Sequence, residues 1–320
     1  MFLRSALLIV ILASSAVMLE AATPREPKGR TFQFTYQVQL HGLTPGQTYR
    51  LWLPMPKTSD FQQVIDIDHK PVGQIGSDSK FANRIFYIEG YADKAGEAVC
   101  ITKYKVTRKE VTSSGPVPSA SEIEMFLKAD KMVPIEGKPL TLIEGKTLPG
   151  DKMELARTLY DTVNDHMKYS KEGTGWGRGD SNWACDSKFG NCTDFHSLFI
   201  SLARAQKMPA KFEIGFSVPE ARGAGEIAGY HCWAFFQPES GKGWVPVDIS
   251  EANKNPKMTA YYFGNLTENR LTLSTGRDIV LEPAQAGPPL NFFIYPYVEV
   301  DGKPLAAEKI KRVVKYKDLK

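Results

Sequence analysis

A cysteine stands where a turn sequence becomes a helical pattern. In GNCTDFHSLFISLARAQ, residues 190–206, Cys192 follows a Gly-Asn pair, and apolar residues then recur from Phe195 to Ala203 at the spacing of one helix face. Unpaired N–H groups and peptide dipoles at a helix start stabilise a thiolate, and with a histidine nearby they lower a cysteine pKa from about 8.5 to roughly 3.5–7.5. The same N–H groups can stabilise the oxyanion of an acyl intermediate. The position of Cys192 therefore predicts a nucleophile.

A thiol nucleophile needs a base, and the base needs a group that orients it. His231 lies in GYHCWAFF, inside a predicted strand, and Asp248 lies in GWVPVDIS, on the strand expected next. Two neighbouring strands joined by a turn can hold an imidazole and a carboxylate side by side. Asp248 would then accept a hydrogen bond from one ring nitrogen of His231 while the other nitrogen faces Cys192.

Other roles for these residue types are open. Cys192 could be a buried structural thiol or half of a disulfide, although its polar neighbours argue against deep burial. His196, one helical turn after Cys192, is the weaker candidate for the base because its side chain is expected to point along the helix. Asp194 is expected to stabilise the first turn. A zinc site needs closely spaced ligand pairs, whereas Cys185 and Cys192 are seven residues apart, so no metal is expected.

The remaining cysteines leave the redox state open. Cys100, Cys185 and Cys232 join Cys192 to make four, and even numbers usually pair in an oxidising compartment. If Cys192 works as a thiol, at most one bridge forms among the other three. The sequence does not choose the pair.

Three tryptophans are candidates for the walls of a substrate site. Trp176 and Trp183 lie in KEGTGWGRGDSNWACDSKFGN, a glycine-rich stretch that leads to Cys192, and Trp233 lies two residues after His231. Long irregular segments inside a compact region are usually functional or disordered. Each tryptophan could equally be a packed core residue.

The elements that must position these residues follow from the periodicity. Residues 30–111 contain several segments with a period of two or strong β-forming composition, such as TFQFTYQVQL, which predict an antiparallel sandwich-like domain. A helix is expected from Asp151, then the helix after Cys192, then three sequential strands. This order predicts an α+β core with an antiparallel sheet. Later strands, RLTLS, DIVLEP and FFIYPYVEV, have no assignable partners.

The N-terminus resembles an export signal. Arg4 precedes an apolar core at residues 6–12, and small residues follow at Ala21 and Ala22, which is the order of a cleaved signal peptide; an uncleaved anchor is the alternative. We therefore expect a periplasmic or secreted protein with no stable membrane span after processing. The expected organisation is a signal peptide at 1–22, a β domain at 23–112, a linker at 113–149, a catalytic domain at 150–262 and a C-terminal β extension at 263–320.

The composition indicates a globular chain. Among 320 residues, 42% are hydrophobic, and 40 basic and 36 acidic residues are mixed along the sequence for a net charge of +4. No long run of either sign occurs, so a nucleic-acid partner is not expected. No calcium-loop pattern and no cofactor motif is present, so no cofactor is expected.

Three motifs in order resemble a known family. GNCTDFHSLFISLARAQKMPAKFEIGF, GYHCWAFF and GWVPVDIS are similar to the transglutaminase-like superfamily, whose bacterial members carry a Gly-x-Cys-x-Asp helix start, a His-x-Trp strand and a Trp-x-x-x-Asp strand. The resemblance implies a papain-like α+β fold with Cys192 as nucleophile, His231 as base and Asp248 as orienting group. Cys232 departs from the pattern, because many relatives carry a small apolar residue there.

These observations predict an exported thiol enzyme. Cys192 would form a thioester with an acyl group from a peptide or protein substrate, cell-wall peptides included. Hydrolysis, as in a protease or amidase, is favoured over amine transfer because water is always available outside the cytoplasm and nothing marks an amine site. The alternative is a non-catalytic peptide- or glycan-binding module on the same fold. An acetyltransferase of the arylamine type shares the Cys-His-Asp order, but its acyl donor is cytoplasmic.

Overall fold

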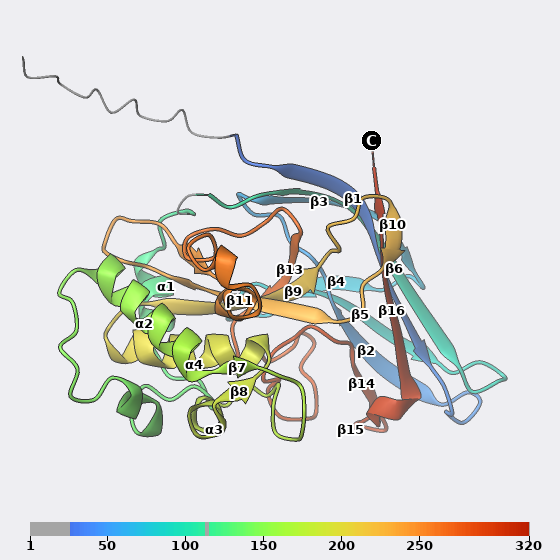
Figure 1. Ribbon diagram of the computed structural model, residues 1–320. Helices are drawn as coiled ribbons and strands as arrows, with labels where there is room; N and C mark the ends of the chain where they lie inside the picture. Colours follow the sequence, from blue (N-terminus) through green and yellow to red (C-terminus); the bar gives the residue numbers. More distant parts are fainter. Residues whose placement is uncertain (1–25, 113–114, 320) are drawn as a thin grey trace, which may run out of the picture.

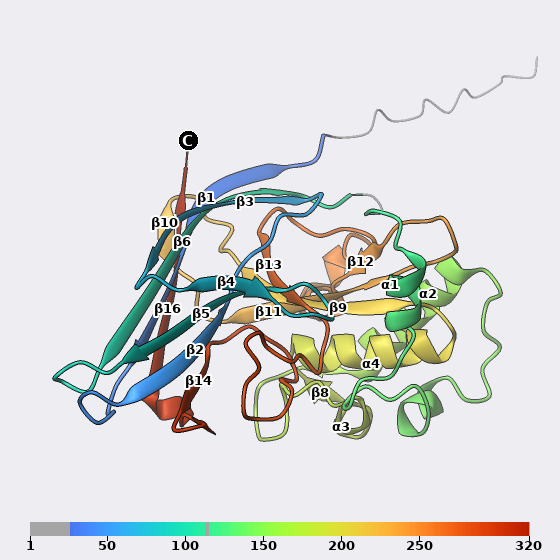
Figure 2. The same cartoon turned by 180° about the vertical axis from the view of Figure 1, so that it is seen from behind.

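A computed structural model describes residues 26–112 and 115–319 of the chain (Figure 1). The predicted signal peptide at residues 1–22 lies outside the described residues. Figures 1 and 2 show β-sheets at one end of the molecule and helices at the other, with strands β9 and β11 running beside helix α4.

The first sheet is built on a strand with a strict two-residue period. In β1 (Gly29–Leu40) every second side chain from Phe32 to Leu40 is fully buried, as expected when one face of a strand packs on a core. β1 pairs antiparallel with β6 (Ala98–Lys109) and with β16 (Ile310–Asp318). β3 (Gln62–Lys70) and β10 (Ala224–Glu226) complete the sheet in the order β10-β16-β1-β6-β3.

The second sheet faces the first and closes the sandwich. Its order is β15-β14-β2-β5-β4, formed by β2 (Thr48–Pro54), β4 (Gln74–Ser77), β5 (Arg84–Tyr91), β14 (Tyr297–Val300) and β15 (Lys303–Pro304). Phe34 and Tyr36 of the first sheet share one core with Leu51 and Leu53 of the second. The all-β sandwich-like region is therefore confirmed. The late strand β14, whose partners the sequence left open, belongs to it, as does β16, which was not predicted.

The mixed core consists of one central helix against an antiparallel sheet. Helix α4 (Cys192–Ala205) packs on the sheet β12-β11-β9-β13, whose strands are β9 (Ala210–Ser217), β11 (Tyr230–Phe236), β12 (Val245–Val247) and β13 (Arg270–Thr275). Helices α2 (Lys152–His166), α3 (Ser181–Ser187) and α5 (Ile249–Lys254) pack around α4. The predicted α+β fold with the cysteine helix on an antiparallel sheet is confirmed.

Short elements fill the connections. The predicted linker 113–149 contains α1 (Ala120–Met125) and the 3-10 turn η1 (Lys138–Leu142), and two-residue strands β7 (Lys168–Tyr169) and β8 (Phe189–Gly190) pair in parallel beside α3. Further 3-10 turns are η2 (Pro256–Met258) and η3 (Ala307–Lys309). Within residues 26–112 and 115–319, none of the helices combines the length and apolar character needed to span a lipid bilayer.

Buried polar contacts join the sandwich to the central sheet. The amide of Gln62 bonds to both the N–H and the carbonyl of Thr272 at 2.9 Å, and the amide of Asn83 does the same with Thr275 at 2.7 and 2.8 Å. Because each side-chain amide satisfies a backbone donor and a backbone acceptor that would otherwise be buried alone, separating the two parts would be costly. The sandwich therefore holds the β13 side of the sheet in place.

Candidate active site

Local interactions place Cys192 at the first position of α4. Asn191 is the N-cap, and its side-chain oxygen accepts from the N–H of Thr193 at 2.9 Å, while Asp194 accepts from the N–H of Asn191 at 2.9 Å to complete a capping box. Gly190 is required by this packing, because a Cβ there would lie 2.5 Å from a carboxylate oxygen of Asp194. No acceptor for the Cys192 N–H occurs in the described part of the chain, so this donor is available to a ligand.

Asp194 also fixes the glycine-rich segment that precedes the helix. Its two carboxylate oxygens accept from the N–H groups of Gly177 at 2.7 Å and Gly179 at 2.9 Å. Burial raises the pKa of Asp194, and the three backbone hydrogen bonds oppose this rise. The residue expected to stabilise the first helical turn thus also ties residues 177–179 to the start of α4.

The Cys192 thiol is more deeply buried than we predicted from its polar sequence neighbours. Cys192 is 2% exposed, and Asn191, Thr193 and Asp194 are as deeply buried. The expectation that polar neighbours keep the cysteine near the surface is wrong, because these side chains satisfy one another and nearby backbone groups inside the protein.

His231 and Asp248 are brought together as predicted from their strands. His231 lies on β11, and Asp248 follows β12 as the N-cap of α5; the His231 Nε2 to Asp248 Oδ2 distance is 2.7 Å, and both residues are buried. Burial alone would lower the pKa of the imidazole, but the charge of Asp248 outweighs it and raises the pKa of His231 to about 9. The ring is therefore protonated at neutral pH.

This imidazolium acts on the ionisation of the Cys192 thiol. Burial would raise the pKa of the Cys192 thiol, yet hydrogen bonds with Cys232 and His231 and the positive charge of His231 bring it well below its ordinary value. Because Nε2 of His231 is used by Asp248, Nδ1 is the nitrogen left for the sulfur. Cys192 and His231 thus form a thiolate–imidazolium pair.

Arg270 is a further charged member of the site that sequence reasoning missed. It lies at the start of β13, is buried, and donates to Oδ2 of Asp248 from Nη2 at 2.9 Å and from Nε at 3.2 Å, and to Oγ of Ser217 from Nη1 at 2.8 Å. Burial would raise the pKa of Asp248, but the charges of His231 and Arg270 hold it well below its usual range. Asp248 therefore remains ionised between two cations.

Replacing Arg270 by methionine should lower the catalytic rate on the order of tenfold, because Asp248 loses the two bonds that fix its orientation. Since the charge of Arg270 lowers the pKa of His231, its removal should also move the alkaline limb of the pH–rate profile upward. The matched control is Arg84→Met, which breaks the half-exposed pair with Asp66 at 2.6 Å. A profile that shifts equally in both variants would contradict a role at Asp248.

His196 is close to the site but is not placed as the base. Its Nε2 accepts from the N–H of Ile249 at 3.0 Å, and its Nδ1 lies 3.6 Å from the sulfur of Cys232. Burial lowers the pKa of His196 to about 4, so the ring is neutral. The ring bridges the cysteine helix and the residue after Asp248, which suits a structural role.

Cys232 supplies a second thiol beside the nucleophile. Its sulfur lies 3.9 Å from Oγ1 of Thr193, and burial together with the neighbouring Cys192 raises the pKa of Cys232 well above its ordinary value. Cys232 therefore stays protonated and can donate to the thiolate. Each of the four cysteines, all within the described residues, is a free thiol in the structure.

Cys232→Ala should raise the pKa of Cys192 by about one unit, because the thiolate loses one hydrogen-bond donor. Site-resolved mass spectrometry of iodoacetamide labelling across pH would measure the midpoint for Cys192. The control is Cys100→Ala, which removes a buried thiol of the sandwich, whose pKa burial raises to about 12. An unchanged midpoint in Cys232→Ala would show that the second thiol does not stabilise the first.

One set of residues has metal-like spacing. His231, Asp248 and Glu251 offer ligand atoms within 4.8 Å of one another. However, Oδ2 of Asp248 already accepts from His231 and twice from Arg270, and Oδ1 accepts from the N–H of Glu251 and from Ser250 at 3.2 Å. A cation would have to displace a buried guanidinium, so the arrangement fits an ion-pair network better than a metal centre.

The three tryptophans lie in different surroundings. Trp176 is half-buried in the segment before α3, where its indole N–H donates to the carbonyl of Gly173 at 3.1 Å. Trp183 lies on α3 and packs edge-on against Phe189, with ring centroids 5.3 Å apart. Trp233 is fully buried, with its indole N–H directed at Glu213 at 3.2 Å. Trp233 is too deeply buried to contact a substrate. Trp176 and Trp183 each keep a partly exposed surface and remain candidates for substrate binding.

Tyrosines beside the cysteine were not identified from the sequence. The Tyr230 hydroxyl accepts from the side-chain amide of Asn191 at 2.8 Å and lies 3.0 Å from Oγ1 of Thr193, and its ring packs on Tyr295 with centroids 5.8 Å apart. Burial raises the pKa of Tyr230 and of Tyr169, and the negative charge of Cys192 adds to both. The one available signal was the place of Tyr230 directly before His231 on the strand.

Comparison with known proteins agrees with this geometry. A family model described as the transglutaminase-like superfamily matches residues 142–249. An uncharacterized protein from Haemophilus influenzae is 25% identical over 86% of each chain. The crystal structure of a proposed cysteine protease from Cytophaga hutchinsonii is similar in fold, with a TM-score of 0.52 and 14% identity over 91% of this chain and 98% of that chain.

A weaker likeness is found to the periplasmic domain of TgpA from Pseudomonas aeruginosa, bound to ethylmercury. Its TM-score is 0.34, with 16% identity over 71% of this chain and 92% of that chain. The matched family segment holds the cysteine helix, the histidine strand and the aspartate. Residues 142–249 of the chain therefore form a transglutaminase-like core.

Proposed function

We propose that the protein is an exported thiol hydrolase that cleaves amide bonds of peptide or protein substrates through a thioester on Cys192. The observation that carries the proposal is the buried chain Cys192, His231, Asp248 and Arg270, in which an imidazolium stands between a thiolate and a carboxylate. The match of residues 142–249 to the transglutaminase-like superfamily supports cysteine-dependent catalysis.

The first half of the proposed reaction forms the acyl-enzyme. The Cys192 sulfur attacks the carbonyl carbon, and the Cys192 N–H at the start of α4 donates to the oxygen that gains negative charge. Collapse of this intermediate breaks the C–N bond while the His231 imidazolium gives its proton to the leaving amine. Asp248, fixed by Arg270, keeps the ring oriented throughout.

The second half releases the product. Neutral His231 takes a proton from a water molecule that attacks the thioester carbon, and the thiolate leaves, restoring the thiolate–imidazolium pair. A primary amine in place of water would give a transamidase instead. We favour water, because the site has no feature that selects an amine.

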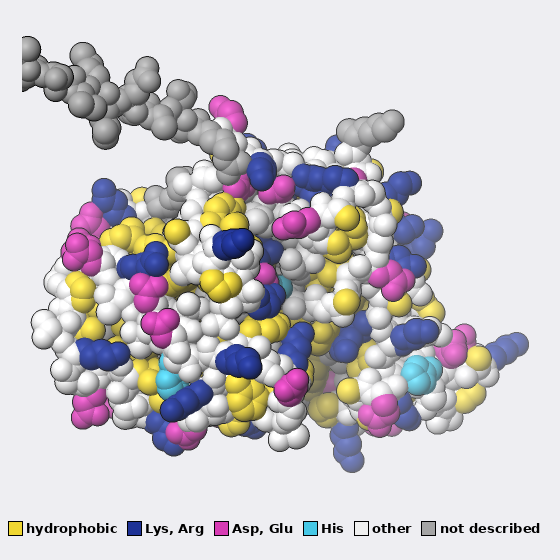
Figure 3. All heavy atoms as spheres, in the orientation of Figure 1, with side chains coloured by type: hydrophobic (Ala, Val, Ile, Leu, Met, Phe, Trp, Pro, Cys, Tyr) yellow, Lys and Arg dark blue, Asp and Glu magenta, His cyan; other side chains and the backbone are white. Residues whose placement is uncertain are grey.

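Export and the class of substrate are part of the same proposal. The signal-like residues 1–22 support a periplasmic or secreted location, where cell-wall peptides are among the available substrates. Positive and negative side chains are interspersed on the face seen in Figure 3, which gives no support to a nucleic-acid partner.

The test is incubation of the protein with a peptide library and a primary amine, followed by mass spectrometry. The expected result is a covalent acyl adduct on Cys192 together with cleaved peptides, both absent in Cys192→Ala. Amine incorporation without cleavage would assign the transamidase. The matched control is Cys185→Ala, which removes a buried thiol of α3. Product formation by Cys192→Ala would overturn the mechanism.

One observation favours a second candidate, a non-catalytic peptide- or glycan-binding module. Cys192 is only 2% exposed, as a structural thiol would be. The two functions differ in thiol reactivity: an enzyme should show Cys192 reacting with iodoacetamide well below pH 7, with the effect lost in His231→Ala. A binding module should react near pH 8.5 or not at all.

A further inference from the structure

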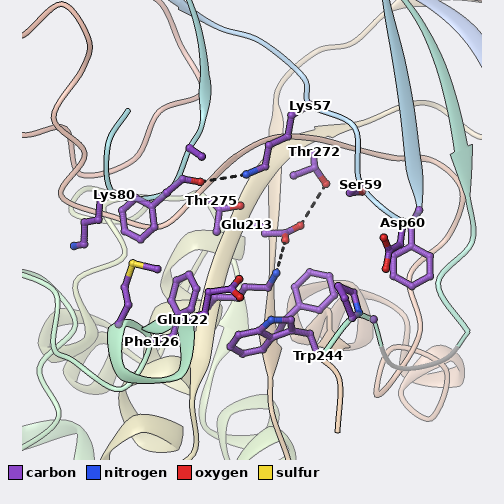
Figure 4. Close-up of a pocket in the computed structure, with 18 of the residues that line it drawn as sticks. Lys57, Ser59, Asp60, Lys80, Glu122, Phe126, Glu213, Trp244, Thr272 and Thr275 are labelled. Atoms are coloured by element: carbon purple, nitrogen blue, oxygen red, sulfur yellow. Dashed lines mark hydrogen bonds and ion pairs between the residues drawn. The ribbon is translucent and has the colours of Figure 1, made fainter. Parts of the chain in front are cut away.

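A cavity lies on the face of the central sheet that is turned away from α4. It has a volume of about 460 Å³ and separates β9, β11 and β13 from α1 and the loops of the sandwich (Figure 4). Strand alternation explains the placement: Phe236 packs on Phe199 of α4, whereas Phe235 lines the cavity. Neither Cys192 nor His231 lines it. We call it the sheet-face cavity, bounded by Lys57, Arg108, Phe126, Lys211, Glu213 and Trp244.

Aromatic rings form the walls of the sheet-face cavity. Phe126, the C-cap residue of α1, stacks on Phe81 with centroids 6.0 Å apart and meets Trp244 edge-on at 5.5 Å. Phe61 and Phe235 complete the lining. Such a wall suits a planar apolar group, and the volume lies in the range of small-molecule sites, roughly 300–1,000 Å³.

The interior carries more positive than negative charge. Lys211 pairs with Glu213 at 3.1 Å, and the other Glu213 oxygen accepts from Trp233 and Thr272. Lys57 and Arg108 have no carboxylate within ion-pair distance in the described ranges 26–112 and 115–319. One carboxylate therefore faces three cations inside the cavity.

Arg108 is the deepest of these cations. It is 2% exposed, and its Nε donates to the carbonyl of Arg270. Within the described residues, the hydrogen bond of the Arg108 guanidinium is made by Nε. Burial lowers the pKa of the Arg108 guanidinium to about 10 and also lowers that of Lys57, and the charge of Glu213 offsets this loss of hydration only in part.

The carboxylates at the opening of the sheet-face cavity do not neutralise Lys57 and Arg108. Glu122 accepts from the N–H and hydroxyl of Ser119 in the capping box of α1. Asp60 is exposed to solvent, as is the cation Lys80. In Figure 4 Glu213 lies among the lining side chains and Asp60 lies at their edge, while the Lys57 amine donates to the carbonyl of Phe81 at 3.2 Å.

We propose that the sheet-face cavity binds an organic carboxylate with an aromatic body. The carboxylate would lie against Lys57 and Arg108, whose planar guanidinium matches carboxylate geometry, and the ring would pack among Phe81, Phe126 and Trp244. Such a group occurs in free aromatic acids and at the C-terminus of a peptide that ends in an aromatic residue. The site is separate from the thiol chemistry and goes beyond the proposed hydrolase function.

Isothermal titration with two pairs of probes tests the proposal. Phenylacetate and N-acetylphenylalanine carry the carboxylate, and phenylacetamide and N-acetylphenylalaninamide are their neutral counterparts. The expected result is saturable binding of the carboxylates and at least about tenfold weaker binding of the amides. Tighter binding of N-acetylphenylalanine than of phenylacetate would indicate a peptide C-terminus, and the reverse a free acid. Equal binding of carboxylate and amide, or no saturable binding of either, would overturn the proposal.

Variants locate the site. Lys57→Met should weaken phenylacetate binding about tenfold or more while the circular dichroism spectrum stays unchanged, and Lys211→Met should weaken it less because Glu213 already neutralises Lys211. The matched control is Lys303→Met, an exposed lysine of β15 outside the cavity. An equal loss in Lys303→Met would place the probe elsewhere. Cys192→Ala should bind phenylacetate as the wild type does. The experiment can therefore disprove the proposed carboxylate site independently of the proposed hydrolase function.

Discussion

Cys192→Ala should reduce peptide turnover on the order of 10⁵-fold or more. A loss of this size is typical when the nucleophile is removed from a set of catalytic residues that act together. Alanine cannot form the thioester, and no other thiol is placed to replace it: Cys232 stays protonated because burial and its neighbour raise its pKa. Steady-state release of a fluorogenic peptide amide measures the effect.

The protein should stay folded in this variant. Cys192 sits at a helix start fixed by the capping box of Asn191 and Asp194, neither of which bonds to the sulfur. Cys100→Ala, in the sandwich core, is the matched control and should keep full turnover. Residual activity within tenfold of wild type in Cys192→Ala would move the chemistry to another residue.

Asp248→Asn should lower kcat by about 10³–10⁴-fold, because the carboxylate that keeps His231 protonated and oriented is replaced by a neutral amide. The charge of Asp248 raises the pKa of His231 to about 9, so its loss should bring that pKa down and move the alkaline limb of the pH–rate profile to lower pH. This shift is opposite in sign to that expected for Arg270→Met. A pH–rate profile of kcat distinguishes the two variants.

The same substitution should destabilise the fold by about 3 kcal/mol, since Arg270 is left buried without its counter-charge. In the wild type, the pKa of His231 is higher in the folded state than its ordinary 6.5. The proton on His231 therefore contributes its full stability below about pH 6.5, and this contribution is lost as the pH rises through about 9. Urea unfolding at pH 6 and pH 10 would show this loss in the wild type and a smaller one in Asp248→Asn.

The Cys-His-Asp set could be predicted from the sequence because each member is marked by a local pattern. Cys192 follows a capping sequence, His231 lies on β11, and Asp248 directly follows β12, the strand next to β11 in both the chain and the sheet. Arg270 could not be found in this way. Arg270 reaches Asp248 from β13, which pairs with β9 at the edge of the sheet opposite β12. The contact between Arg270 and Asp248 therefore depends on tertiary packing.

The fold class followed from periodicity, whereas strand partners did not. The alternation of β1 predicts a half-buried strand, but nothing local shows that its neighbour is β16. The burial of Cys192 was predicted wrongly for a related reason. Residue type indicates only the usual environment of a side chain. Here Asn191, Thr193 and Asp194 make their hydrogen bonds inside the protein and not with water.

The pairing of β1 with β16 has a consequence for how the chain matures. Arg30 and Asp318 form an ion pair at 2.8 Å although they are 288 positions apart, so a nascent chain emerging from the ribosome cannot close its first sheet until nearly all of it has been synthesised. Until then β1 presents an open edge to other chains. A chain delayed in this way keeps that strand edge unpaired for longer, which is compatible with the export that we propose.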